Sequence, residues 1–130
     1  MPESKDVLPR LEKSFAQLEL AVATPVAEPR DLAGIVKSFE FVFELSWKCI
    51  QAMAHAQGRE VLSPRAAFEE AFRLTWVNDP VVWKEILNDR NRTVHTYNED
   101  FAILMCRRIQ QQYIPAFSAL LTSLRAQELS

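Results

Sequence analysis

Residues 31–53 read DLAGIVKSFEFVFELSWKCIQAM, and the spacing of their apolar side chains decides the fold. At about 100° of rotation per residue, eight of these side chains share one face of an α-helix. The stretch therefore predicts one long helix, opened by Asp31 and running to about residues 55–57, where Gly58 can end it. The side chains on the shared face are Leu32, Ile35, Val36, Phe39, Phe43, Trp47, Ile50 and Met53.

The same helix carries apolar residues on its far side as well. Phe41 and Leu45 point nearly opposite to the main stripe. A helix that is apolar on two sides lies either at the centre of its bundle or at an interface between copies, and both positions stay open for this pair. The charged residues Glu40, Glu44 and Lys48 follow one another at intervals of four, which we interpret as a solvated stripe.

Prolines and capping residues mark the ends of the other helices. Pro115 lies inside the last of them and predicts a kink near residues 111–112. No segment alternates with period two for long, so we predict an all-α bundle of about five helices in a single domain, residues 1–130. The boundary signals are Thr24-Pro25 at the end of the first helix, Ser63-Pro64 and Asn78-Asp79-Pro80 at later helix starts, and Asn98 at the start of the last helix.

Composition and charge narrow the functions that this chain can have. Two glycines in 130 residues argue against a glycine-rich phosphate loop, and we expect no cofactor. A net charge of −2 argues against a broad polyanion-binding surface, so any contact with nucleic acid must be local. Cys49 and Cys106 lie far apart, so we expect two buried thiols and neither a disulfide nor a metal site. With no apolar leader and no long apolar window, we expect a cytoplasmic protein without a membrane span.

Residues 88–98, NDRNRTVHTYN, contain several side chains that can bind an anion or exchange a proton. We expect them between a helix that ends near Asn91 and the final helix. Arg90 supplies a permanent planar cation that can hold two phosphate oxygens, and His95 can exchange a proton near neutral pH. Asn91 can donate and accept hydrogen bonds and so orient either group. We assign the other histidine, His55, to the negative end of the long helix.

Such residues could cleave RNA without a metal. The ribose 2′-hydroxyl would attack the adjacent phosphate, while His95 moves protons and Arg90 stabilises the charged phosphorane. The reaction needs both a base and an acid, and the motif has one histidine, so a two-fold dimer would complete the site. In the alternative interpretation, Arg90 only pairs with an acidic neighbour such as Asp89 or Glu99, and His95 satisfies a helix end.

Two stretches of the chain resemble a known family. Residues 39–48, FEFVFELSWK, are close to the run F-E-F-x-F-E-L-x-W-K, and residues 88–97 are close to the run D-R-N-x-x-x-H-x-Y. Between them, Ser63-Pro-Arg65 and Trp83 fall where the family has S-P-R and V-W. Over roughly residues 8–125, the sequence thus resembles the nucleotidyltransferase substrate-binding protein family, the HepT-like members of the HEPN superfamily.

The resemblance implies an up-and-down antiparallel bundle with a four-helix core that forms a homodimer. It also implies an RNA substrate and a partner, an MNT-type nucleotidyltransferase, with which the chain forms a toxin–antitoxin pair. Carried over position by position, Arg90 and His95 would be the catalytic residues of a metal-independent endoribonuclease that leaves a 2′,3′-cyclic phosphate, with Asn91 in support. Tyr97 would accept adenylyl groups from the partner, which adds bulk and negative charge where an RNA phosphate should lie.

Two other functions remain open at this point. An older interpretation of the family makes the chain a non-catalytic substrate-binding subunit that docks the nucleotidyltransferase through exposed apolar surface. The third possibility is a structural bundle in which the Arg–His motif only caps helices. Toxicity of the chain alone separates the first function from the other two.

Overall fold

A computed structural model describes residues 3–95 and 98–129 of the chain. Within these ranges every regular element is helical, which confirms the predicted all-α fold. α5, the short π-helix η1 and α6 follow one another without a break and form one continuous helix. The elements are α1 (Ser4–Ala23), α2 (Pro29–Ala56), α3 (Pro64–Arg73), α4 (Pro80–His95), α5 (Glu99–Arg108), η1 (Ile109–Tyr113) and α6 (Ile114–Glu128).

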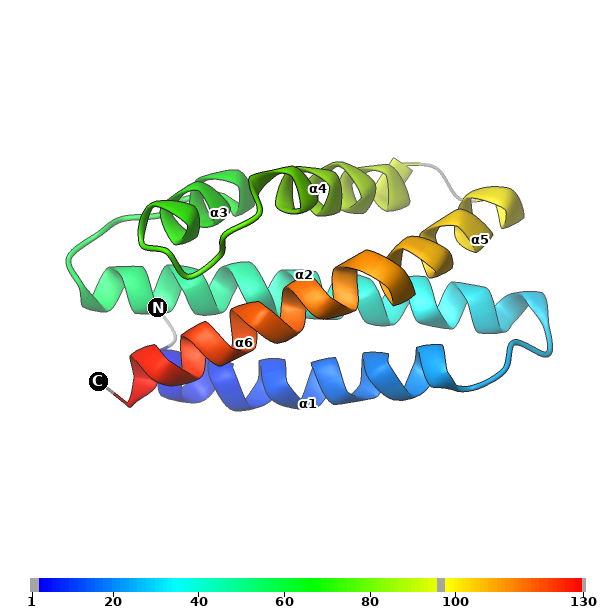
Figure 1. Cartoon of the computed structure of the whole chain (residues 1–130), viewed down its shortest axis with the longest axis horizontal. Helices are drawn as coiled ribbons and strands as arrows, with labels where there is room; N and C mark the ends of the chain where they lie inside the picture. The colour runs from blue at the N-terminus through cyan, green and yellow to red at the C-terminus, as the bar shows by residue number, and fades with distance from the viewer. Residues whose placement is uncertain (1–2, 96–97, 130) are drawn as a thin grey trace.

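The long helix α2 lies at the centre of the bundle. α1 runs antiparallel along one side of it, and α3 and α4 follow one another along the opposite side (Figure 1). The continuous helix from α5 to α6 crosses α2 obliquely and ends beside α1. Phe41 of α2 stays 56% exposed and Leu45 is half-buried, so Phe41 is not a core residue.

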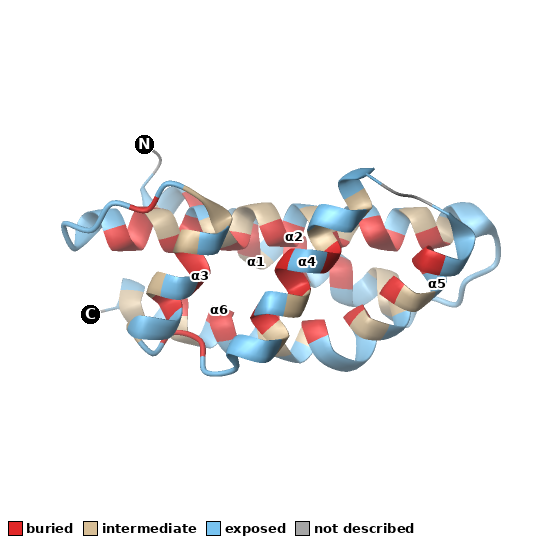
Figure 2. Cartoon of the chain, turned by 90° about the horizontal axis from the view of Figure 1, so that it is seen from above, coloured by how far each residue is buried: buried red, intermediate tan, exposed pale blue. Residues whose placement is uncertain are grey.

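Aromatic side chains fill the centre, where α2 meets α4 and the last helix. The ring centroid of Phe39 lies 5.7 Å from that of Tyr113, and the centroid of Trp83 lies 5.5 Å from that of Phe117. Buried residues line the inner faces of the helices, and the outer faces are exposed (Figure 2). The predicted stripe of α2 is confirmed except at the half-buried Trp47, and its buried members are Leu32, Ile35, Val36, Phe39, Phe43, Ile50 and Met53.

Most helix ends lie at the capping residues that the sequence predicts. Ser63 Oγ accepts a hydrogen bond from the Ala66 N–H at 3.1 Å at the start of α3. Asn98 Oδ1 accepts one from the Phe101 N–H at 2.8 Å at the start of α5. Gly58 follows α2 with a φ of +79°, a conformation that glycine adopts without steric cost. Local capping chemistry therefore sets where these helices begin and end.

Three details differ from the prediction. α2 begins at Pro29, two residues before the predicted Asp31, which lies in its first turn. α4 continues to His95, one turn beyond the expected end near Asn91, because no glycine or proline interrupts it. Arg92 and His95 place positive charge at the negative end of the helix, which favours the additional turn. The prediction of two buried thiols is confirmed for Cys49 only, because α5 turns Met105 into the core and leaves the adjacent Cys106 half-buried.

The last helix is distorted where Pro115 predicts a kink. Proline lacks a backbone N–H, and its ring crowds the carbonyl four residues earlier, here that of Gln111. The chain accommodates this with η1, in which the Ile114 N–H donates to the Ile109 carbonyl, five residues back. The disturbance thus includes the predicted residues 111–112, and it takes the form of a π-turn.

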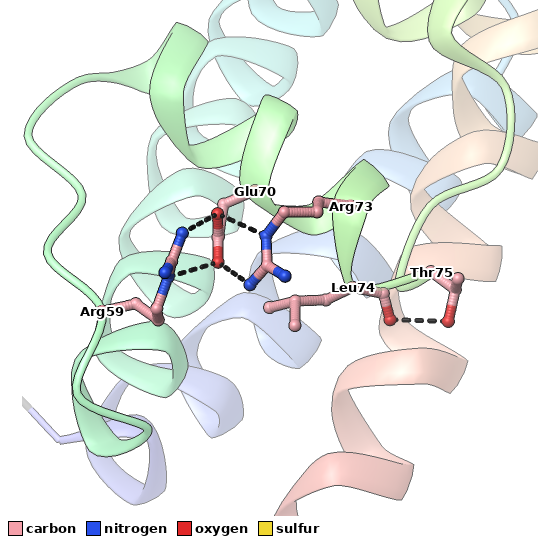
Figure 3. Close-up of polar contacts among 5 residues, drawn as sticks. All are labelled: Arg59, Glu70, Arg73, Leu74 and Thr75. Carbon is pink, nitrogen blue, oxygen red and sulfur yellow. Dashed lines mark hydrogen bonds and ion pairs between the residues drawn. The ribbon is translucent and has the colours of Figure 1, made fainter.

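The carboxylate of Glu70 in α3 pairs with two arginines, and one of them lies in the segment before α3. Glu70 accepts hydrogen bonds from Arg59 Nε at 3.0 Å and from Arg73 Nε at 3.1 Å (Figure 3). The bonds from Arg73, and then those from Arg59, lower the pKa of Glu70 from 4.5 to about 2. Because the folded pKa lies below the unfolded one, this carboxylate stabilises the fold above about pH 4.5 and loses that contribution as the pH falls towards 2.

We expect Glu70→Gln to lower the Tm by about 2–4 °C at pH 7, because no carboxylate then bridges the two arginines. The difference from the unchanged protein should shrink below pH 4.5 and become small near pH 2, where Glu70 itself becomes protonated. Thermal melts followed by circular dichroism from pH 7 to pH 2 measure it. Glu69→Gln, at the exposed neighbour, is the matched control. A Tm difference that stays constant with pH would contradict the prediction.

Candidate functional site

The polar motif forms the second half of α4. Asp79 opens this helix, because its Oδ1 accepts hydrogen bonds from the N–H groups of Val81 and Val82, each at 3.2 Å. The helix then runs without interruption into residues 88–95. The motif therefore extends from a helix whose first half is anchored by three buried apolar side chains, Trp83, Ile86 and Leu87.

Arg90 points towards α2. Its Nη2 donates to Glu44 Oε1 at 2.9 Å, and its guanidinium carbon lies 4.9 Å from the centroid of the Phe43 ring. A weaker bond of 3.4 Å joins Arg90 Nη1 to Asn91 Oδ1. The Arg90 side chain is 26% exposed. It is thus a cation whose direction is fixed by α2 and which an anion can still reach.

Glu44 belongs to this site, and the sequence interpretation missed it. Its carboxylate accepts from Trp47 Nε1 at 3.0 Å as well as from Arg90. The interpretation of Glu44 as part of a solvated stripe is therefore wrong, whereas Lys48 is exposed as expected. Trp47 follows Glu44 by three residues and lies on the same side of the helix. An indole N–H at that spacing is the sequence signal that could have indicated a hydrogen-bonded carboxylate. The pairing with Arg90 joins two distant segments, and no local pattern reveals it.

Asp89 does not pair with Arg90. Adjacent residues of a helix point about 100° apart, so Asp89 faces the last helix while Arg90 faces α2. Asp89 is 2% exposed and accepts hydrogen bonds from Arg108 Nη1, at 2.8 and 2.9 Å, and from the hydroxyl of Tyr113. Glu99, the other expected partner, is exposed in the first turn of α5. The alternative interpretation was thus right that Arg90 has an acidic partner and wrong about which residue it is.

His95 is the last residue of α4 and is exposed, as is Asn91 one turn earlier. Among the residues that the structure describes, His95 has no hydrogen-bond or ion-pair partner. Arg90 and His95 are about 7.5 Å apart along the helix axis and about 140° apart around it. One chain therefore places both on the same helix end without directing them at one point. Tyr97 lies outside the described residues.

A groove between α1 and α2 lies beside this site. Its volume is about 400 Å³, and Glu44 forms part of its wall. The exposed ring of Phe41 borders this groove. The lining residues are Val7, Arg10, Phe41, Glu44, Leu45, Lys48 and Gln51.

Other kinds of site have little support in the described part of the chain. No three metal-binding side chains gather there, and none of its helices has the length and apolar character to cross a membrane. Burial raises the pKa of the Cys49 thiol to about 12 and also raises that of Cys106, which makes both sulfurs poor nucleophiles. The end of α4 remains the place where cationic and proton-exchanging side chains come together.

Known proteins are similar to this chain in sequence and fold. A family model described as nucleotidyltransferase substrate binding protein like matches residues 6–126, a range that contains both the α2 stretch and the α4 motif. A crystal structure of a protein from Thermus thermophilus superposes with a TM-score of 0.73 and is 28% identical in sequence. That match covers 90% of this chain and 97% of the other. No match was found among the curated proteins.

Proposed function

The chain belongs to the family of nucleotidyltransferase substrate-binding-like proteins, and on this premise we propose that it is the toxin of a toxin–antitoxin pair. In this proposal it is a metal-independent endoribonuclease of the HEPN type, active as a homodimer. Arg90 and His95 are its catalytic residues, with Asn91 in support. The observation that carries the proposal is the end of α4, where a partly exposed arginine and an exposed histidine without a described partner lie on one helix.

The proposed reaction takes one proton from the RNA and returns one to it. His95 accepts the proton of a ribose 2′-hydroxyl, whose oxygen attacks the neighbouring phosphorus. The bond from phosphorus to the 5′-oxygen breaks, and that oxygen receives a proton from a second His95. A 2′,3′-cyclic phosphate remains on one product. Arg90 binds the non-bridging oxygens and stabilises the charge that grows on them in the transition state.

A second copy of the chain supplies the second histidine. Arg90 and His95 of one chain point about 140° apart around α4, so one chain does not direct both side chains at the same phosphate. A two-fold axis beside the end of α4 gives one cleft two arginines and two histidines. The exposed apolar ring of Phe41, in the groove that Glu44 borders, suits an interface close to that axis.

Glu44 competes with RNA for Arg90. A carboxylate and a phosphate bind the same guanidinium N–H groups, so the incoming phosphate has to displace or share this partner. The Glu44–Arg90 pair is partly exposed and contributes no more than about 1 kcal/mol, which a phosphate held by two N–H groups can exceed. Glu44 thus keeps Arg90 extended over Phe43 until RNA binds.

The partner in this proposal is an MNT-type nucleotidyltransferase that transfers adenylyl groups to Tyr97. The phenol oxygen attacks the α-phosphate of ATP, pyrophosphate leaves, and the phenol proton goes to solvent. The new phosphodiester places a negative charge two residues from His95 in the sequence. It repels RNA at the position where the RNA phosphate has to bind.

Incubation of the purified chain with RNA and excess EDTA tests the proposal. We expect cleavage to continue, and the products to carry 2′,3′-cyclic phosphate and 5′-hydroxyl ends, because the proposed mechanism uses only histidine proton transfer and arginine charge stabilisation. End-group analysis by mass spectrometry identifies the products. Cleavage that stops with EDTA, or products with 3′-hydroxyl and 5′-phosphate ends, would contradict this mechanism.

The second candidate function is a non-catalytic subunit that binds substrate for the nucleotidyltransferase. The family description favours it, and so does the ion pair that already occupies Arg90 in the free chain. This function predicts tight co-purification with the partner and no RNA cleavage by the free chain at any pH. The cleavage assay therefore separates the two functions directly.

A further inference from the structure

The half of α4 that carries the motif has no apolar anchor. The last buried apolar residue of this helix is Leu87. Among residues 88–95 only Asp89 is buried, and the exposed Val94 contributes nothing to the core. Burial of apolar area is the main force that holds a helix on its bundle. The position of the motif therefore depends on polar contacts, and the most deeply buried of these belongs to Asp89.

Two side chains of the last helix hold Asp89. Arg108 Nη1 donates to both carboxylate oxygens, at 2.8 and 2.9 Å, and the hydroxyl of Tyr113 donates to Oδ2. Tyr113 is 0% exposed, and its single hydroxyl proton is shared with Glu85 Oε1, one turn earlier on α4, at 3.1 Å. Burial and the nearby carboxylates raise the pKa of Tyr113 well above its usual value, so the hydroxyl keeps the proton that it donates.

The π-turn is what brings these two donors together. In a regular α-helix, residues five apart, such as Arg108 and Tyr113, point about 140° apart. In η1 the hydrogen bonds run over five residues, so residues five apart lie about one turn above each other. Both side chains can then reach the same carboxylate. The distortion that accompanies Pro115 thus has a direct consequence for the contact that holds α4.

Asp89 and Arg90 hold α4 from two sides at the same level. Asp89 fixes the helix to Arg108 of α5 and Tyr113 of η1, and Arg90 fixes it to Glu44 and Phe43 of α2. We infer that Asp89, Arg108 and Tyr113 form a clamp that positions Arg90 and His95 for the reaction. This inference rests on the proposed function for the role of the motif, and on the contacts above for the clamp itself.

The test uses two clamp variants and one matched control. Tyr113→Phe removes a single hydroxyl without leaving a hole, and Arg108→Gln removes the cation that faces Asp89. Arg107→Gln makes the same chemical change one residue earlier, at an exposed side chain that has no ion pair with another described residue. All three are measured in the full chain, at a temperature where each variant is folded by circular dichroism.

The first readout does not depend on activity. The indole N–H of Trp47 donates to Glu44, which binds Arg90, so its ¹H–¹⁵N resonance reports on the placement of the motif arginine. We expect this resonance to shift in both clamp variants and to stay in place in Arg107→Gln. A merely stabilising role would lower the Tm of the clamp variants and leave the Trp47 resonance unchanged in the folded protein, and that result would overturn the inference.

The second readout is RNA cleavage. We expect kcat to fall roughly tenfold in Tyr113→Phe and Arg108→Gln while KM changes little, because misplaced groups slow the chemical step more than they weaken binding. A wild-type kcat in both clamp variants would overturn the positioning role. If the unchanged chain cleaves no RNA, the proposed function fails, and the Trp47 resonance still decides whether the clamp positions Arg90.

Discussion

Toxicity of the chain expressed alone should disappear on His95→Ala or Arg90→Ala. Loss of His95 removes the group that moves both protons, and loss of Arg90 removes the charge that stabilises the transition state. Each change should lower the rate of RNA cleavage by about 100-fold or more. Growth after induction measures the effect in cells, and single-turnover cleavage measures it with purified protein.

The chain offers matched controls for both substitutions. His55 is the other histidine and lies exposed in the last turn of α2, so His55→Ala repeats the change at an equivalent place in another helix. Arg107→Ala does the same for the arginine. Both catalytic variants should remain folded, because the Glu44–Arg90 pair contributes no more than about 1 kcal/mol and His95 has no described partner. Toxicity of His95→Ala equal to that of the unchanged chain would exclude the nuclease.

The arrangement of the helices could be predicted because its causes are local. The stripe from Leu32 to Met53 follows the helical period, and burial confirms seven of its eight members. Ser63 and Asn98 cap the helices that they were predicted to cap, because a side-chain oxygen satisfies an N–H two or three residues away. Pro115 predicts the distortion of the last helix because its effect is local too: it lacks a backbone N–H and crowds the preceding turn.

The contacts around the motif could not be predicted, because they join segments that are distant in the sequence. Glu44 and Arg90 lie 46 positions apart, and neither end carries a local sign of its partner. Asp89 is acidic and next to Arg90, which suggested a pair, whereas helix geometry turns it towards Arg108 and Tyr113. The meeting of these two donors at one carboxylate depends on the π-helix η1, and no local sequence pattern shows that Asp89 lies opposite it.

Tyr97→Phe should make the chain insensitive to its partner while leaving it toxic. The substitution removes only the phenol oxygen, so the partner has no acceptor at this position and cannot place a negative charge beside the motif. Co-expression with the neighbouring nucleotidyltransferase should restore growth for the unchanged chain and fail to do so for Tyr97→Phe. Silencing of Tyr97→Phe as complete as that of the unchanged chain would show that the partner acts in another way.

Intact-mass measurement locates the modification, because the chain contains only two tyrosines. Tyr113 is 0% exposed and its hydroxyl is bonded to Asp89, so a folded chain cannot present it to a second enzyme. In a His95→Ala background, which keeps the host cells alive, incubation with the partner and ATP should add the mass of one adenylyl group, that of AMP less one water. The same chain with Tyr97→Phe should gain nothing. Addition of AMP to that double variant would place the acceptor on another side chain and remove Tyr97 from the proposed mechanism.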